Sequence, residues 1–200
     1  MCRPLAQTSF PVVHFMSLQL TIIPYGGAPP LAFGISSGAT CALAGEPLQV
    51  NRRVLPPLPP GTRATASDFR RDPFSIITGA NPAYAEHHYP GISLAFDKTD
   101  RLCQIGFGKN FEGSLILEGI DVLKSPHALE TLVKLDGKPY HSVGFVMLMN
   151  LGVRLGGYHE TADEGRTVSL FERGRYDNSF ARFQAFDPDS PSCSSEEGRS

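Results

Sequence analysis

The sequence lacks any long run of basic residues. Its 18 lysines and arginines and 20 aspartates and glutamates leave a formal net charge of -2, and its longest basic runs are the pairs Arg52-Arg53 and Arg70-Arg71. Proteins that bind nucleic acid or an anionic membrane surface usually gather positive charge on one face. We therefore expect neither a nucleic acid nor a membrane among the partners of this chain.

Cysteine is scarce, and the four cysteines lie far apart at Cys2, Cys41, Cys103 and Cys193. They show no C-x-x-C spacing, which argues against a structural zinc site, and they are too few for a dense disulfide framework. Cys41 and Cys103 lie within apolar segments, which is typical of cysteines that act as small buried hydrophobic residues. This usage favours a reducing compartment, so we expect the protein in the cytoplasm.

The amino-terminal segment lacks an unbroken apolar run. Pro11, His14 and Gln19 interrupt it, whereas a signal peptide needs a continuous apolar region and a membrane span needs about 20 apolar residues. We therefore expect neither of these. Residues 1–17 are predicted to form an extension before the domain, and Met16 is a candidate for the natural start.

Motifs of nucleophilic and phosphate-binding enzymes are also lacking. The chain has no G-x-S-x-G sequence and no glycine-rich loop that ends in G-K-[ST]. The glycines around Lys109, in GFGKNFEG, follow a predicted strand and do not open a helix, which is typical of a turn. We therefore expect no catalytic residues and no cofactor.

Alternating apolar residues predict three consecutive strands from residue 91 onward. GISLAFD places Ile92, Leu94 and Phe96 on one face, and RLCQIGF repeats the pattern from Cys103 to Phe107. SLILEGIDVL follows as the third strand. Because the turns between these segments are short, they predict an antiparallel meander with one buried face.

Two segments carry helix signals. Ser36 and Gly45 enclose a short predicted helix over residues 39–44, with the serine as cap and the glycine as stop. The clearer helix has Ser125 as its predicted cap and Gly137 as its stop, and its apolar residues are spaced to form one face. Both helices need a sheet or another helix to cover their apolar sides.

The order of the elements predicts an α+β fold. VGFVMLMNLGVRLGG and RTVSLFERG supply further strands, so that a helix followed by a meander occurs twice. We expect an antiparallel sheet with helices packed on one face, in an order that suits two tandem helix-plus-meander units. A single domain is expected over residues 18–180, with sub-units at 18–123 and 124–180, and residues 181–200 are expected to form a mostly disordered tail.

The stretch YAEHHYPG contains the first candidate contact residues, Tyr84, Glu86, His87, His88 and Tyr89. Adjacent residues of an extended chain point to opposite sides, so the two histidines do not favour a shared metal ion, whereas Glu86 and His88 share a side. We therefore expect no metal site. The stretch is typical of a polar strand with an aromatic rim, and such rims suit contacts with another protein.

A second candidate contact is the polar turn that begins at Tyr158. It continues with His159, Glu160, Asp163 and Glu164. Carboxylates concentrated on a turn favour contact with a basic partner, and a solvated turn without a partner is the plainer alternative.

Two longer patterns carry a family resemblance. LAFGISSGATCALAGEP is similar to the opening of small bacterial helix-plus-sheet domains, including the family related to the β-lactamase inhibitor protein. GISLAFDKTDRLCQIGF, continued by LILEGIDVLKSPHALETL, resembles bacterial proteins of the same build, some of which look like immunity proteins of secreted toxins. The resemblance covers roughly residues 31–174, and it implies a non-catalytic protein whose partner is a cognate protein toxin. It implies no catalytic residues.

Two other functions remain as alternatives. A small hydrolase could use His87 or His88 as acid or base together with a carboxylate such as Glu86 or Asp97. A structural or assembly module could instead use an exposed strand edge. The lack of catalytic motifs favours the non-catalytic binding protein over the hydrolase.

Overall fold

The computed structural model describes residues 18–52, 84–142, 144–158, 165–177 and 183–186. The predicted extension over residues 1–17 lies outside this range, and so does most of the predicted tail. The same holds for four candidate contact residues, which are His159, Glu160, Asp163 and Glu164. No described helix is both long and apolar enough to cross a membrane.

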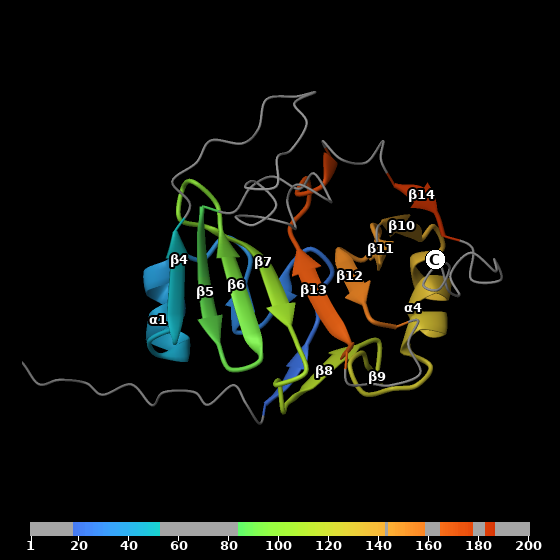
Figure 1. The fold of residues 1–200 in the computed structure, drawn as a ribbon, viewed down its shortest axis with the longest axis horizontal. Coiled ribbons are helices and arrows are strands. Elements are labelled where there is room, and N and C mark those ends of the chain that lie inside the picture. The colour runs from blue at the N-terminus through green and yellow to red at the C-terminus, as the bar shows by residue number, and fades with distance from the viewer. Residues whose placement is uncertain (1–17, 53–83, 143, 159–164, 178–182, 187–200) are drawn as a thin grey trace, which may run out of the picture.

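The described part of the chain has the α+β architecture that the sequence predicts, built on a nine-stranded antiparallel sheet (Figure 1). Two α-helices accompany it in the described residues, α1 (Ser37–Ala44) and α4 (Ala128–Asp136). In spatial order the strands of the large sheet are β14 (Gln184–Ala185), β10 (Tyr140–Ser142), β11 (Phe145–Leu148), β12 (Val153–Gly156), β13 (Thr167–Phe171), β7 (Leu102–Phe107), β6 (Ile92–Phe96), β5 (Ala85–Tyr89) and β4 (Gln49–Arg52).

The order of elements repeats along the chain. Helix α1 is followed by the four strands β4 to β7, and helix α4 is followed by the four strands β10 to β13. The two four-stranded halves meet in the centre of the sheet, where β7 pairs antiparallel with β13. Strand β14 then pairs with β10, so the sheet includes residues beyond position 180, where the sequence predicted the domain to end.

The third strand of the predicted meander was placed wrongly. Residues 114–121 leave the large sheet and form β8 (Ser114–Leu117) and β9 (Ile120–Asp121), and β1 (Gln19–Thr21) pairs parallel with β8. The physical reason is that both edges of β7 are already occupied, by β6 and by β13. A further small hairpin joins β2 (Gly27–Ala28) to β3 (Leu31–Ala32).

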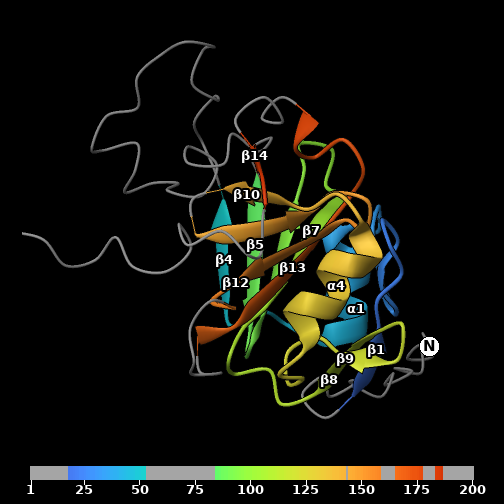
Figure 2. The same cartoon turned by 90° about the vertical axis from the view of Figure 1, so that its right-hand side faces the viewer.

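One face of the large sheet, here called the helix face, carries the main core. Its central row runs through Leu94, Ile105, Leu170, Val153 and Leu148, which are neighbours in the strand registers. All five belong to the largest buried apolar cluster, to which α4 contributes buried residues as well. Figures 1 and 2 place the ribbons of α1 and α4 on the same side of this sheet.

The opposite face, here called the front face, is more polar. Its central row runs through Ser93, Gly106, Ser169, Arg154 and Met147. The buried guanidinium of Arg154 donates a hydrogen bond of 2.8 Å to the Ser169 hydroxyl. Each residue of this row is the sequence neighbour of a residue in the apolar row. The two rows lie on opposite faces because successive residues of a strand alternate between the faces.

Cys103 lies on a different side from the one that the alternating pattern predicted. The register between β6 and β7 shifts after Ala95, so that Phe96 pairs with Leu102 while Ala95 pairs with Gln104. This bulge leaves Cys103 in a small separate cluster with Ala95, and Leu102 takes its place in the main core. A bulge of one residue reverses the faces of the residues that precede it, which a strict alternation cannot anticipate.

The helix boundaries agree with the predicted stops and with one of the two predicted caps. Ser36 caps α1, since its side chain accepts a hydrogen bond from the Ala39 backbone N–H, and Gly45 ends the helix. Gly137 ends α4 at a φ of 71°, a left-handed conformation that favours glycine. The cap of α4 is His127, whose side chain makes no capping hydrogen bond, whereas the predicted cap Ser125 lies two residues earlier.

Candidate functional site

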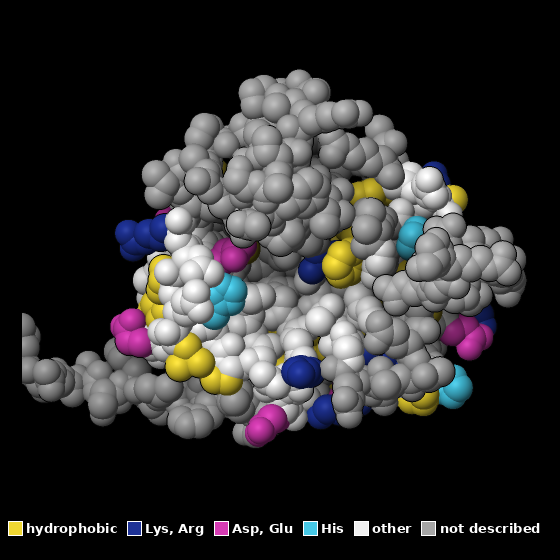
Figure 3. Space-filling model, viewed as in Figure 1, with side chains coloured by type: hydrophobic (Ala, Val, Ile, Leu, Met, Phe, Trp, Pro, Cys, Tyr) yellow, Lys and Arg dark blue, Asp and Glu magenta, His cyan; other side chains and the backbone are white. Residues whose placement is uncertain are grey.

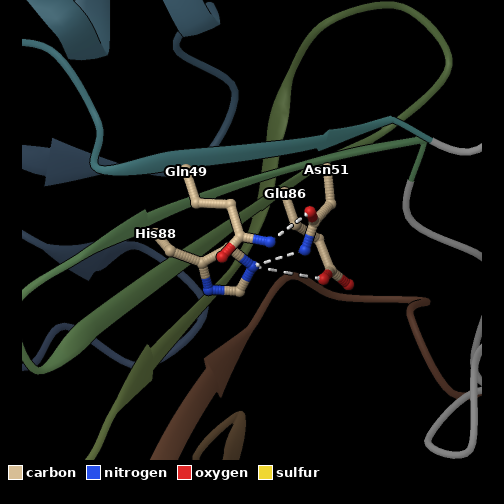
Figure 4. Close-up of polar contacts among 4 residues, drawn as sticks. All are labelled: Gln49, Asn51, Glu86 and His88. Atoms are coloured by element: carbon tan, nitrogen blue, oxygen red, sulfur yellow. Dashed lines mark hydrogen bonds and ion pairs between the residues drawn. The ribbon is translucent and has the colours of Figure 1, made fainter.

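Four polar side chains gather on the front face of β4 and β5 (Figure 4). They are Gln49, Asn51, Glu86 and His88, and we call this set the β4–β5 patch. The register pairs Gln49 with His88 and Asn51 with Glu86. Because residues two apart on a strand share a side, each strand contributes two neighbouring members.

A chain of hydrogen bonds fixes the arrangement of the patch. The Gln49 side-chain amide donates to the Asn51 Oδ1 at 2.7 Å, which leaves the Asn51 Nδ2 facing the His88 Nε2 at 3.1 Å. An amide nitrogen can only donate, so the His88 Nε2 accepts and the ring hydrogen lies on Nδ1. The Glu86 carboxylate lies 3.7 Å from the same Nε2, close enough to pair with His88 when the ring is protonated.

The surroundings of the patch are exposed and partly apolar. The side chains of His88 and Glu86 are 36% and 39% exposed, and all four residues of β4 are exposed. Leu48 and Tyr84 are exposed, and so is Val50, whose pairing with His87 turns its side chain away from the patch. Figure 3 shows a histidine with an acidic side chain beside it over β4 and β5. Polar groups and apolar area are thus combined on a strand that ends the sheet of described strands.

His87 lies on the other face of β5 and is not part of the patch. It is 7% exposed, and its ring lies 4.8 Å from the ring of Phe96, measured between centroids. Burial lowers the pKa of His87. Its Nδ1 has no hydrogen-bond partner among the described residues. The structure therefore separates the two adjacent histidines, as the alternation of an extended chain requires.

Two of the candidate tyrosines make contacts within the fold. The Tyr89 hydroxyl donates to the Gly45 carbonyl at 3.3 Å, which ties β5 to the end of α1, and burial raises the pKa of Tyr89. The Tyr158 hydroxyl donates to the Val122 carbonyl at 2.6 Å, and this side chain is buried. Tyr84, by contrast, is exposed beside the patch.

The carboxylate of Asp97, which the hydrolase alternative would need, is used by a turn. Its Oδ1 accepts hydrogen bonds from the backbone N–H and the hydroxyl of Thr99, both at 2.8 Å, and from the Arg101 backbone N–H at 3.0 Å. Burial acts to raise the pKa of Asp97, but these hydrogen bonds outweigh it and hold the pKa below its ordinary value. Asp97 therefore stabilises the turn between β6 and β7.

This lowered pKa predicts an acid-dependent contribution to stability. A folded-state pKa below the unfolded value of about 3.9 means that the ionised Asp97 stabilises the folded protein above that pH. The contribution disappears as the pH falls through the folded-state pKa. Chemical denaturation between about pH 5 and pH 2 should show a smaller loss of stability for Asp97→Asn than for the wild type. Equal pH profiles would contradict the role given to Asp97.

No metal centre is formed by the described residues, because no group of three or more histidine, cysteine, aspartate or glutamate side chains lies within reach of one ion. In the β4–β5 patch only Glu86 and His88 are of these types. Gln49 and Asn51 supply amides that satisfy hydrogen bonds within the patch.

Gln49 and Asn51 are the members of the patch that the sequence did not predict. Their alternation in QVNR is the signal that was available, since it places both side chains on one side of a strand. The partner strand was not evident, because β4 and β5 are separated by more than thirty residues in the sequence.

Comparisons with protein-family models, with curated proteins and with solved structures find no match to this chain.

Proposed function

We propose that this chain is a non-catalytic binding protein, a bacterial immunity protein of the cytoplasm that neutralises a cognate toxin by direct contact. The observation that carries the proposal is the β4–β5 patch with its exposed apolar neighbours. The sequence resemblance to bacterial immunity proteins supplies the class of partner.

The patch has the composition of a protein contact surface. Exposed Tyr84, two residues before Glu86, adds an aromatic ring with a polar tip. Exposed Val50 pairs with His87 and offers apolar area on the other face of this edge. Within the patch, His88 and Asn51 hold each other in place before any partner arrives. Side chains that are already ordered lose less conformational entropy on binding, and this lowers the cost of association.

The position of β4 offers a second means of contact. Among the described strands β4 ends the large sheet, with β5 as its neighbour on one side. A terminal strand can pair with an extended segment of another protein through main-chain hydrogen bonds. The partner would then add a strand beside β4 and place its side chains against the patch.

The contacts of the candidate catalytic groups favour binding over hydrolysis. Asp97 is engaged in a turn, His87 is buried against Phe96, and the His88 Nε2 accepts from Asn51. A general base needs a free nitrogen within reach of the proton that it removes. The Asn51 amide competes for that position on His88.

The proposal predicts that one charge reversal in the patch abolishes protection. Cells that express the toxin encoded beside this gene should grow when the wild-type chain is co-expressed. Glu86→Lys should remove that protection, because a lysine at this site repels a basic toxin surface and disturbs His88. Growth on plates and the amount of soluble protein in lysates are the two measurements.

The matched control is Glu130→Lys, which reverses the same charge on the exposed surface of α4, where Glu130 pairs with Lys134. It should protect as well as the wild type. If the wild-type chain gives no protection, the proposed function is wrong. If Glu86→Lys protects fully, the toxin does not bind at the β4–β5 patch.

A further inference from the structure

A second feature of the fold is an open cleft of ≈ 480 Å³ beside the carboxyl end of β13 and the turn between β11 and β12. Among the residues that line it are Tyr25, Lys138, Phe171, Arg173 and Tyr176. With Met149 and Asn150, which also line it, they come from four separate stretches of the chain, so the cleft exists only in the folded protein. Its volume lies within the range of small-molecule sites, roughly 300–1,000 Å³.

Packed aromatic rings form part of the cleft wall. The rings of Phe171 and Tyr176 meet edge to face, with centroids 4.7 Å apart, and Tyr25 packs edge to face on Phe171 at 6.3 Å. Phe171 and Tyr176 are buried, whereas Tyr25 is half-buried. Edge-to-face pairs hold one another's orientation, so the two buried rings support Tyr25, which is the ring of these three that keeps exposed surface.

Positive charge surrounds these rings. Of the described residues, Lys138, Arg173, Arg175 and one carboxylate, Asp177, line the cleft, so these charged side chains sum to +2, against -2 for the whole chain. The buried carboxylate of Asp136 lies behind the wall, where it accepts from the Lys138 backbone N–H. When Asp136 is included, these charged side chains sum to +1, so the cleft carries positive charge on a protein whose net charge is negative.

The two arginines are held in defined positions. The Arg173 guanidinium carbon lies 4.4 Å from the centroid of the Tyr25 ring. The Arg175 Nε donates to the Gln104 side-chain carbonyl at 3.1 Å. Arginine presents its N–H groups in a planar fork that fits a carboxylate or a phosphate, and guanidinium groups fixed in advance bind such anions with less loss of entropy.

Tyr25 itself has an unfavourable backbone conformation, with a φ of 58°. A bulky side chain rarely takes this left-handed region, and such residues concentrate at ligand sites where the surroundings enforce them. Here Gly152 leaves the necessary space, because a Cβ atom at that position would lie 3.0 Å from the Tyr25 ring. Tyr25 thus keeps its ring beside Gly152 at the cleft despite its unfavourable φ.

We propose that the cleft binds a small organic anion that carries a planar ring, such as a nucleoside monophosphate or an aromatic carboxylate. The ring of the ligand contacts the exposed part of Tyr25, and its anionic group lies beside Lys138 and Arg173. This site is separate from the β4–β5 patch and does not depend on the function proposed for that patch.

The test is calorimetric titration of the full chain with AMP and with benzoate, and with adenosine and inorganic phosphate as partial ligands. At least one of the two complete probes should bind saturably at one site per chain. Adenosine and phosphate should each bind at least about tenfold more weakly than AMP if AMP is the probe that binds, because each lacks one of the two recognised parts.

Charge-removing variants locate the binding. Arg173→Gln and Lys138→Gln should each weaken the better probe by about tenfold or more, since each removes a charge-assisted contact. The matched control is Lys134→Gln, an exposed lysine on α4 outside the cleft, which should bind as the wild type does. Thermal unfolding of every variant shows whether it remains folded.

Two results would overturn the proposal. The first is that neither AMP nor benzoate binds saturably. The second is that Arg173→Gln and Lys138→Gln both remain folded and bind the better probe like the wild type.

Discussion

Replacing Leu132 with alanine should lower the free energy of unfolding by about 2–5 kcal/mol. Leu132 is fully buried and lies in the core cluster between α4 and the large sheet. The change removes apolar atoms from that cluster and leaves a cavity that the surrounding strands can close only in part. Urea denaturation followed by circular dichroism measures the loss as a shift of the midpoint.

The matched control is Leu135→Ala on the same helix. Leu135 is 45% exposed, so the same substitution removes few buried contacts and should cost less than about 1 kcal/mol. If the two variants lose the same stability, α4 does not pack on the sheet through the face that carries Leu132.

Replacing Asp136 with alanine should cost about 2–4 kcal/mol of the free energy of unfolding. Its buried carboxylate accepts hydrogen bonds from the backbone N–H groups of Lys138, Asn150 and Leu151. These bonds join the end of α4 to the turn between β11 and β12, and the variant leaves the donors without their acceptor. Burial raises the pKa of the Asp136 carboxyl, while the same three N–H groups act against that rise.

The control for Asp136 is Glu130→Ala, which removes an exposed carboxylate from the same helix. An exposed ion pair contributes little to stability, so this variant should unfold almost as the wild type does. Hydrogen exchange provides a second measurement, since Asp136→Ala should speed exchange of the Asn150 and Leu151 amides. Unchanged exchange at both amides would contradict the role of Asp136 as a clamp.

The repeated units of this fold could be predicted from local patterns. The apolar face of α4, the stop at Gly137 and the cap at Ser36 all depend on residues within one helix. The alternation of β6 and the α+β class likewise follow from short-range spacing. Such features need no knowledge of which strands become neighbours.

The features that could not be predicted depend on contacts between distant segments. Strand β8 lies outside the large sheet because β13 occupies the edge of β7. Strands β7 and β13 are about sixty residues apart in the sequence, so their pairing has no local signal. The bulge at Ala95 turns Cys103 away from the main core. Asp136 gives no sequence signal of its own, because its partners at Asn150 and Leu151 approach only through the fold.

The candidate site was predictable in part, for the same reason. The alternation of YAEHHY places Glu86 and His88 together, and the structure has them 3.7 Å apart. The same alternation turns His87 to the opposite face, where it is buried, so this predicted contact residue is not part of the patch. Gln49 and Asn51 lie in the patch because of the register between β4 and β5, which local spacing does not reveal. The position of Tyr158 likewise depends on its distant partner Val122.

The central claim is that a toxin binds this chain at the β4–β5 patch. Its most direct measurement is calorimetric titration of a purified, inactivated toxin into the wild-type chain, Glu86→Lys and Glu130→Lys. We expect one saturable site for the wild type and for Glu130→Lys, and binding at least about tenfold weaker for Glu86→Lys. Equal affinity for all three chains, or no binding by the wild type, would contradict it.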